Sequence, residues 1–234
     1  TYNPAYRGNN REVFNKSGKF LYKTTTYFFR EDLNWTCLAE LLGEKYKTVQ
    51  KVNVLNHACS NGQEPYTLAV KLIQILGKEA KKFFPIQAKD IDFDNIESAN
   101  RGRLGIKLNE MYRINHYTKN QLTSFFTLGK PANPNNDLVL IPKENIKSKV
   151  NFSQADILKD TSEKLPDNTV ILCRNFWPYL APAEREQLAS NLYQNIGDNS
   201  LIITGDFDYR SNTPDLLKSR GFVEIGMNNV YIKR

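Results

Sequence analysis

Short apolar runs alternate with longer amphipathic segments along this chain from about residue 51 to its end. Val52–His57, Ile86–Ile91, Thr169–Cys173 and Ser200–Thr204 are apolar runs of the kind found in buried strands. Repeated strand–helix units place their strands parallel, with helices packed on both faces. We therefore predict an α/β fold with a doubly wound, mostly parallel sheet. The helices expected in this region are Pro65–Leu76, Asp94–Arg101, Pro182–Ile196 and Pro214–Arg220.

The last two apolar runs, Phe222–Ile225 and Val230–Ile232, are separated only by Gly226–Asn229. A short connection containing Gly and Asn between two strand patterns is typical of a hairpin. We predict that the chain ends in a hairpin that adds one antiparallel strand to the sheet.

Residues 104–149 interrupt the alternation. Leu104–Leu128 has a helical pattern in part, Gly129–Asp137 is a loop rich in Pro and Asn, and Asp137–Phe152 could hold two short strands. We predict that residues 104–149 form an insertion or subdomain at the sheet's edge, within a domain that runs from 51 to 234.

Residues 1–50 precede this domain. Residues 1–23 are polar and predict a weakly ordered arm. From Thr24 to about Leu42 the apolar residues have helical spacing, and Thr24, Thr25 and Thr26 offer an N-cap for such a helix. We predict an arm followed by one helix.

The composition favours a globular protein in a reducing compartment. Of 234 residues, 40% are hydrophobic, and no apolar run approaches the roughly 20 residues that span a bilayer. No signal peptide is visible. Three cysteines without a Cys-x-x-Cys pair suggest neither a disulfide framework nor a zinc site. We expect a cytoplasmic protein with no membrane insertion and no metal.

The net charge of +7 lies entirely in the first half of the chain. Residues 1–120 carry 19 Lys and Arg against 12 Asp and Glu, whereas residues 121–234 carry 13 of each kind. A basic half favours an acidic partner, either a protein or a nucleic acid. An ordinary solvated surface rich in lysine fits the same count.

In a doubly wound sheet, ligands bind at the loops that follow the carboxyl ends of the strands. The first such loop, Ala58–Pro65 (ACSNGQEP), has small residues that let the backbone approach a ligand, and Gly62 permits left-handed angles. It lacks the glycine pattern of dinucleotide sites and the Gly-Lys-Ser/Thr of phosphate loops. This favours a cofactor without phosphates, although a tight turn without a ligand fits equally well.

Two further loops carry polar side chains. Asp90 ends the second strand, where a carboxylate can accept hydrogen bonds from two ribose hydroxyls. Helix capping or solvation is the other interpretation of this acid. Arg174 and Asn175 directly follow a buried run and precede an aromatic stretch that ends near Tyr179. Such a pattern indicates a pocket wall, and aromatic faces there attract a cation such as a sulfonium.

Four segments occur together in a recognisable order: Thr24–Glu31 (TTTYFFRE), Ala58–Ala69 (ACSNGQEPYTLA), Asp90–Asp92 (DID) and Cys173–Leu180 (CRNFWPYL). They resemble the chemotaxis receptor glutamate methyltransferases of the CheR type, and the resemblance covers about residues 24 to 205. It implies a seven-stranded Rossmann-like methyltransferase sheet, with S-adenosylmethionine as cofactor and S-adenosylhomocysteine as product. The implied methyl acceptor is a glutamate carboxylate of an acidic protein, such as a chemoreceptor helix.

The resemblance also implies roles for individual residues. Asp90 would take the ribose hydroxyls, and Asp156 and Ile157 would flank the adenine. Tyr179, beside the transferring methyl group, and Arg174 would be catalytic, and residues 1–50 would complete the cofactor pocket. The implied cofactor-binding residues are Thr24, Thr26, Arg30, Ala58, Ser60, Gly62, Gln63, Asp90, Asp156, Ile157, Arg174 and Asn175.

Three features depart from the family pattern. Gln63 stands where the family usually has a Glu, and an amide cannot form an ion pair with the methionine ammonium. Gly205–Asp208 (GDFD) replaces Gly-His-Ser-Glu. Only 23 residues precede Thr24, so we expect most of the family's N-terminal helical domain to be missing.

Two other functions stay open from the sequence. The three departures favour a non-catalytic sensor or scaffold that binds S-adenosylmethionine or S-adenosylhomocysteine. The run Asn175–Tyr179 loosely resembles the Asn/Asp-Pro-Pro-Tyr of nucleic-acid amino methyltransferases. Base flipping needs a larger recognition domain than this chain offers, so a nucleic-acid partner is the less favoured interpretation.

Overall fold

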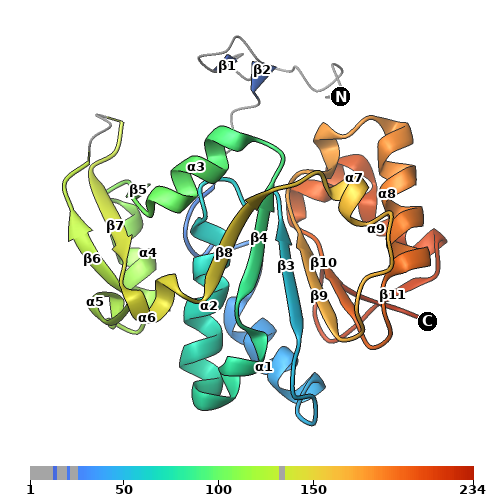
Figure 1. Ribbon diagram of the computed structural model, residues 1–234, viewed down its shortest axis with the longest axis horizontal. Helices are drawn as coiled ribbons and strands as arrows, with labels where there is room; N and C mark the ends of the chain where they lie inside the picture. Colours follow the sequence, from blue (N-terminus) through green and yellow to red (C-terminus); the bar gives the residue numbers. More distant parts are fainter. Residues whose placement is uncertain (1–12, 15–19, 22–25, 132–134) are drawn as a thin grey trace.

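A seven-stranded sheet forms the centre of the protein (Figure 1). The computed structural model describes residues 13–14, 20–21, 26–131 and 135–234. In spatial order the strands are β11 (Phe222–Glu224), β12 (Val230–Lys233), β10 (Leu201–Ile203), β9 (Thr169–Cys173), β3 (Asn53–His57), β4 (Ile86–Asp90) and β8 (Val150–Gln154). β12 runs antiparallel to both of its neighbours, and the strands from β10 to β8 are mutually parallel. The predicted doubly wound, mostly parallel sheet with a closing hairpin is confirmed.

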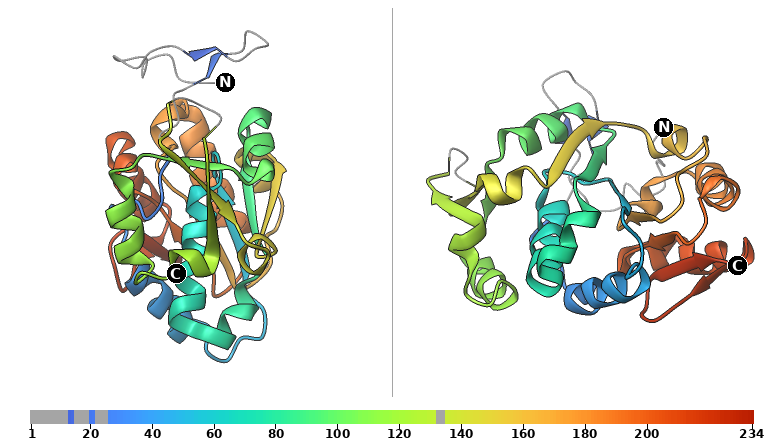
Figure 2. Two further views of the ribbon diagram at one scale, coloured as in Figure 1. Left: turned by 90° about the vertical axis from the view of Figure 1, so that its left-hand side faces the viewer. Right: turned by 60° about the horizontal axis from the view of Figure 1, so that its bottom comes forward.

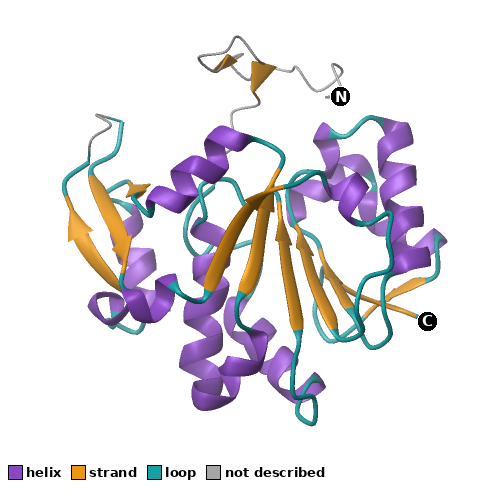
Figure 3. Cartoon of the chain, in the orientation of Figure 1, coloured by secondary structure: helices purple, strands orange, loops and turns teal. Residues whose placement is uncertain are grey.

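Helices cover both faces of this sheet, as Figures 2 and 3 show. In β9, Val170 and Leu172 point into one apolar core, whereas Ile171 and Cys173 point into the other. This alternation follows from the two-residue period of a strand buried on both faces. The first core is covered by α1 (Trp35–Lys45), α2 (Gln63–Leu76) and α3 (Phe93–Arg101), and the second by α7 (Ile157–Asp160), α8 (Pro182–Asn195) and α9 (Thr213–Ser219).

The predicted helix from Thr24 is wrong, because α1 begins only at Trp35. Asn34 is its N-cap, and the Asn34 side chain accepts a hydrogen bond from the N–H of Cys37 at 3.1 Å. Phe29 has a φ of 51°, a left-handed angle that no α-helix contains. The apolar residues before Trp35 are instead buried by tertiary packing of a segment made of turns. Thr26 lies in this non-helical segment, and Thr24 and Thr25 lie outside the described residues.

A second, three-stranded antiparallel sheet stands beside the main one, at the left of Figure 1. Its strand order is β5 (Leu104–Ile106), β7 (Leu138–Pro142) and β6 (Phe126–Gly129). The side chains of Ile106, Phe126 and Leu140 belong to the same core as α2, so the small sheet packs on the main domain. The second strand expected in 137–152 is β8, which joins the main sheet. The helices of this region are α4 (Glu110–Tyr117), α5 (Leu122–Phe125) and α6 (Glu144–Lys147).

The remaining elements are short. Within the described part of the chain, no helix combines the length and apolar character needed to cross a bilayer. The other elements are β1 (Val13–Phe14), β2 (Phe20–Leu21) and the 3₁₀ helices η2 (Gly77–Phe83), η3 (Trp177–Tyr179) and η4 (Asp206–Ser211).

Candidate active site

The loop that follows β3 is tied to the end of β4. The N–H of Ser60 donates to Asp90 Oδ2 at 2.8 Å, and the N–H of Cys59 donates to the Lys89 carbonyl at 3.0 Å. Asp90 Oδ1 accepts from the N–H of Asp92 at 2.9 Å. Burial raises the pKa of Asp90, while these N–H donors oppose that rise. A fixed and nearly buried carboxyl group therefore marks the carboxyl end of β4.

The backbone of this loop adopts unusual angles, and a side chain at Gly62 would clash with its surroundings. Ala58 and Ser60 have φ values of 55° and 50°, in the left-handed region that residues with a side chain rarely adopt. Gly62 has a φ of 95°, and a Cβ built there would lie 2.9 Å from Cζ of Phe152. Unusual angles of this kind persist where the surroundings enforce them, and they cluster at functional sites. The loop is a preformed tight turn that leads into α2.

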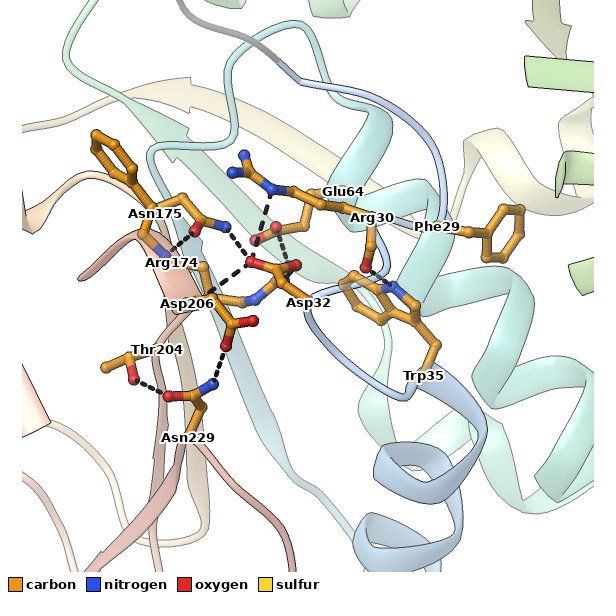
Figure 4. Close-up of polar contacts among 12 residues, drawn as sticks. Phe29, Arg30, Asp32, Trp35, Glu64, Arg174, Asn175, Thr204, Asp206 and Asn229 are labelled. Carbon is orange, nitrogen blue, oxygen red and sulfur yellow. Dashed lines mark hydrogen bonds and ion pairs between the residues drawn. The ribbon is translucent and has the colours of Figure 1, made fainter. Parts of the chain in front are cut away.

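The guanidinium group of Arg174 is buried between two carboxylates (Figure 4). Its Nη1 donates to Glu64 Oε2, its Nη2 donates to Asp32 Oδ1, and its side chain is 0% exposed. The Arg174 Cζ atom also lies 4.9 Å from the centre of the Trp35 ring, which favours a cation over the ring face. Arg174 thus joins the end of β9 to the first turn of α2 and to the segment before α1.

Asp32 is the centre of the polar contacts in Figure 4. Its Oδ2 accepts from Asn175 Nδ2 at 3.0 Å and from the N–H of Asp206 at 3.3 Å. Arg30 Nε forms an ion pair with the same oxygen at 3.6 Å. Through Asp32 the predicted site residues Arg30, Arg174 and Asn175 are brought together.

Asp208 holds the loops after β9 and β10 against each other. Its buried carboxyl group accepts from the N–H groups of Gly205, Asn175 and Trp177 at 2.8, 2.8 and 3.1 Å. Burial raises the pKa of Asp208 to about 7, and the three N–H donors oppose that rise. A Cβ on Gly205 would lie 2.4 Å from Asn175 Oδ1, so this glycine permits the close approach of the two loops.

The other predicted residues lie around two groups of contacts, one at Ser60 and Asp90 and the other at Arg174 and Asp32. Asp156 caps α7 through a 3.0 Å hydrogen bond from the N–H of Leu158, and Ile157 is buried in the second core. Both stay beside the end of β4, because the N–H of Ala155 donates to the Asp90 carbonyl at 2.9 Å. The half-buried Tyr179 ring packs against Phe207, with ring centres 5.5 Å apart.

Gln63 and Glu64 lie in the first turn of α2, directly after the turn that contains Ser60, and Glu64 pairs with Arg174. Gln63 is 4% exposed, and its Oε1 has no donor among the described residues. Burial raises the pKa of Glu64, whereas Arg174 and a 2.8 Å hydrogen bond from Asn56 Nδ2 lower it. The first turn of α2 therefore carries two acceptor groups, the buried and unused Gln63 Oε1 and the Glu64 carboxylate, whose side chain is 14% exposed.

Four acidic residues of this site are absent from the sequence-based set of candidates. Asp32 directly follows the TTTYFFRE segment, Glu64 lies within the second motif, and Asp206 and Asp208 lie in the segment that departs from the family pattern. Their position next to or inside recognised motifs is the only signal that points to them. Acids beside a motif are usually solvated, so no sequence pattern predicts that these four lie together.

The site carries more carboxyl groups than cations. Arg174 lies beside the carboxyl groups of Asp32, Glu64 and Asp208, and Arg30 forms an ion pair with Asp32. With all three carboxyl groups ionised, the negative charges exceed the positive charges, and a positively charged ligand would restore the balance.

A separate cavity of about 460 Å³ lies on the α7 side of the sheet. Leu55, Gln87 and Lys89 from β3 and β4 are among its lining residues, together with Lys159 and Asp160 of α7. None of the predicted site residues lines it. The predicted residues Asp90 and Arg174 lie instead at the carboxyl ends of β4 and β9.

Comparison with known proteins decides the family. Residues 24–222 match the family described as CheR methyltransferase, SAM binding domain. The chain belongs to this family. Its CheR domain uses S-adenosylmethionine as cofactor, and the resemblance drawn from the four sequence segments is confirmed.

Curated relatives match the CheR domain at low identity. Chemotaxis protein methyltransferase 2 of Vibrio cholerae is 22% identical over 84% of this chain and 66% of its own length. Chemotaxis protein methyltransferase of Salmonella typhimurium is 26% identical, covering 84% of this chain and 64% of its own length. The chain thus spans slightly under two thirds of the length of these relatives. A TehB-like SAM-dependent methyltransferase from Corynebacterium glutamicum aligns at 12% identity and a TM-score of 0.44, covering 86% of this chain and 89% of its own.

The residues present fit S-adenosylmethionine. The cofactor carries a sulfonium and an ammonium group, which match the surplus of carboxylates and the raised pKa of Glu64. The unused Gln63 Oε1 is a further acceptor for an N–H donor. Ile91 and Phe93, which are 44% and 54% exposed beside Asp90, offer apolar surface for a flat ring.

Proposed function

We propose that this chain transfers a methyl group from S-adenosylmethionine to side-chain carboxylates, most simply glutamates, of an acidic protein such as a chemotaxis receptor. The observation that carries the proposal is the buried Arg174 guanidinium between Glu64 and Asp32, beside a turn that Asp90 holds in place. This acid-rich pocket at the strand ends suits a cationic cofactor. Membership of the CheR family supports the same conclusion.

The contacts around Asp90 and those around Arg174 and Glu64 have separate tasks in this proposal. Asp90 would hold the ribose, with Ala58, Ser60 and Gly62 shaping the turn around it. Glu64 would pair with the ammonium group, a task that the sequence-based interpretation could not give to Gln63. When bound, the cofactor supplies a methyl group on a sulfonium that is already a good leaving group.

A carboxylate acceptor makes modest demands on the protein. Its oxygen is ionised at pH 7, so the site must orient the acceptor and exclude water, and no general base is required. Tyr179 is our candidate for orienting the acceptor, on the loop that Asp208 fixes through two N–H bonds. The basic first half of the chain favours an acidic substrate surface.

Arg174 has a positioning role in this proposal. Its side chain is 0% exposed and paired with two carboxylates, so contact with the reacting atoms would require it to give up a partner. A positioning role also fits the second candidate function, a non-catalytic sensor that binds the cofactor without transferring its methyl group.

The decisive experiment combines binding with transfer. Calorimetry should show that S-adenosylmethionine binds the wild-type protein, that Glu64→Gln weakens it about tenfold or more through loss of a buried charge pair, and that Glu40→Gln on the exposed face of α1 does not. Labelled methyl transferred to acidic protein and released by mild alkali would support the enzyme. Binding without any methyl transfer would favour the non-catalytic sensor. Label found in RNA or DNA would contradict a carboxyl acceptor.

A further inference from the structure

Donors from three separate segments surround the carboxylate of Asp32. Arg174 Nη2 bonds to its Oδ1. Asn175 Nδ2 at 3.0 Å and the N–H of Asp206 at 3.3 Å bond to its Oδ2, with Arg30 Nε 3.6 Å away. A guanidinium, an amide and a backbone N–H directed at one point make a binding site for a carboxylate, whichever molecule supplies it.

Arg174 does not depend on Asp32 for its charge pairing. Its Nη1 bonds to Glu64, so the guanidinium keeps one carboxylate partner when Asp32 is absent. The charge of Asp32 also raises the pKa of Glu64, which means that the two neighbouring carboxylates repel each other. Asp32 is therefore the replaceable member of this group.

The backbone around Asp32 is firmly anchored, but its side chain is not enclosed. Phe29 is 0% exposed, Leu33 is 3% exposed and Trp35 is 1% exposed, on either side of the acid. The N–H of Phe29 donates to Thr67 Oγ1 of α2 at 3.1 Å. The Asp32 side chain is 11% exposed, so a side-chain rotation can release the donors while the segment stays in place.

We propose that Asp32 is an internal occupant of a carboxylate-binding site and that a ligand carboxylate takes its place on the donors of Arg174, Asn175 and Asp206. This inference rests on the proposed function, which brings two carboxylates to the cleft: that of the cofactor's amino-acid end and that of the acceptor glutamate. Asp32 then lowers the affinity for either one, because only the fraction of molecules with free donors binds it.

The test compares two nucleosides that differ in the carboxylate. S-adenosylhomocysteine carries the amino-acid end, whereas 5′-methylthioadenosine has the same nucleoside and sulfur without it. Calorimetry on the wild-type protein, Asp32→Asn and Asp206→Asn measures each affinity. The Asp206 variant removes a nearby carboxylate whose side chain bonds to Asn229 Nδ2 at 2.9 Å and not to these donors, so it controls for charge alone.

If Asp32 competes with a ligand carboxylate, then replacing Asp32 should strengthen the binding only of ligands that carry a carboxylate. Asp32→Asn should bind S-adenosylhomocysteine about tenfold more tightly, the scale of one charge-assisted contact, while 5′-methylthioadenosine changes less than about twofold and Asp206→Asn has a much smaller effect. Unchanged 5′-methylthioadenosine binding also shows that the variant is folded. A parallel titration with glutarate, in the presence of S-adenosylhomocysteine, reports the acceptor carboxylate.

The titrations with S-adenosylhomocysteine and with glutarate show which molecule supplies the carboxylate. Tightening of S-adenosylhomocysteine assigns the donors to the cofactor, and tightening of glutarate alone assigns them to the acceptor. No tightening in either arm, or loss of affinity for both nucleosides, overturns the proposal. A wild-type protein that binds neither nucleoside would instead refute the proposed function on which it rests.

Discussion

Ser60 and Asp90 are 30 residues apart in sequence, yet the N–H of Ser60 donates to the Asp90 carboxylate at 2.8 Å. The bond fixes the turn after β3 to the end of β4, the two places where the sequence predicted cofactor contacts. Asp90 thus has a structural role as well as its proposed role toward the ribose.

Replacing Asp90 by Asn should weaken both roles. An amide NH₂ group cannot accept from Ser60, so one backbone donor loses its partner at a cost of about 1–3 kcal/mol. We expect reduced stability in urea and at least about tenfold weaker binding of S-adenosylhomocysteine. Asp94→Asn, on the exposed side of α3, should change neither quantity. Equal effects of the two substitutions would show that Asp90 is an ordinary surface acid.

Gly62→Ala should destabilise the protein. The backbone at this position has a φ of 95°, and an added Cβ would lie 2.9 Å from the Phe152 ring. The left-handed backbone costs about 1–3 kcal/mol, and the clash adds to that cost. In a Phe152→Leu background, Gly62→Ala should therefore lower the unfolding free energy in urea by less than it does in the wild type. Equal losses in the two backgrounds would show that the clash is not the cause.

The raised pKa of Asp208 predicts a pH dependence of stability. Its folded-state pKa of about 7 exceeds the usual value of 3.8, so the folded protein binds this proton more tightly than the unfolded chain does. The resulting stability is complete below about pH 4 and is lost as the pH rises through about 7. Urea unfolding between pH 5 and 8 should therefore show a loss that is smaller in Asp208→Asn. An equal loss of stability with pH in the wild type and in Asp208→Asn would show that Asp208 does not cause the pH dependence.

Gln63→Glu should make the free protein less stable and the bound protein relatively more stable. Residue 63 is 4% exposed, so a carboxylate there adds a buried charge beside Glu64 in a site already rich in acids. A cationic cofactor would compensate that charge. Thermal unfolding should show a lower Tm for the free variant and a larger rise on adding S-adenosylmethionine than in the wild type. A smaller rise would place residue 63 away from the cofactor's cations.

The sheet was predictable because its strands carry their own pattern. β9 is buried on both faces and is a continuous apolar run, and the predicted Thr169–Cys173 agrees with its bounds. By contrast, the helix that is observed as α1 was predicted to begin at Thr24, eleven residues before Trp35, because Phe28 and Leu33 continue the helical spacing of the leucines that follow, although both lie in turns before the helix. Periodicity reports burial, and it does not distinguish a helix from a segment that is anchored by tertiary contacts.

The candidate site was predictable only where a motif marked it. Asp90, Arg174 and Asn175 stand directly after apolar runs, so topology alone brings them to one edge of the sheet. Asp32 and Asp208 contact them from other segments, through a turn and a 3₁₀ helix whose paths depend on tertiary packing. Apart from their position beside recognised motifs, a single sequence contains no signal for such contacts.

The ring of Phe29 stacks on Tyr117 of α4, with ring centres 5.3 Å apart, while its N–H is held by Thr67 of α2. The segment that carries Arg30 and Asp32 is therefore anchored to α2 on one side and to α4, in the region of the small sheet, on the other. We expect that removing this region would loosen the segment, and that a partner bound to α4 would change the positions of Arg30 and Asp32.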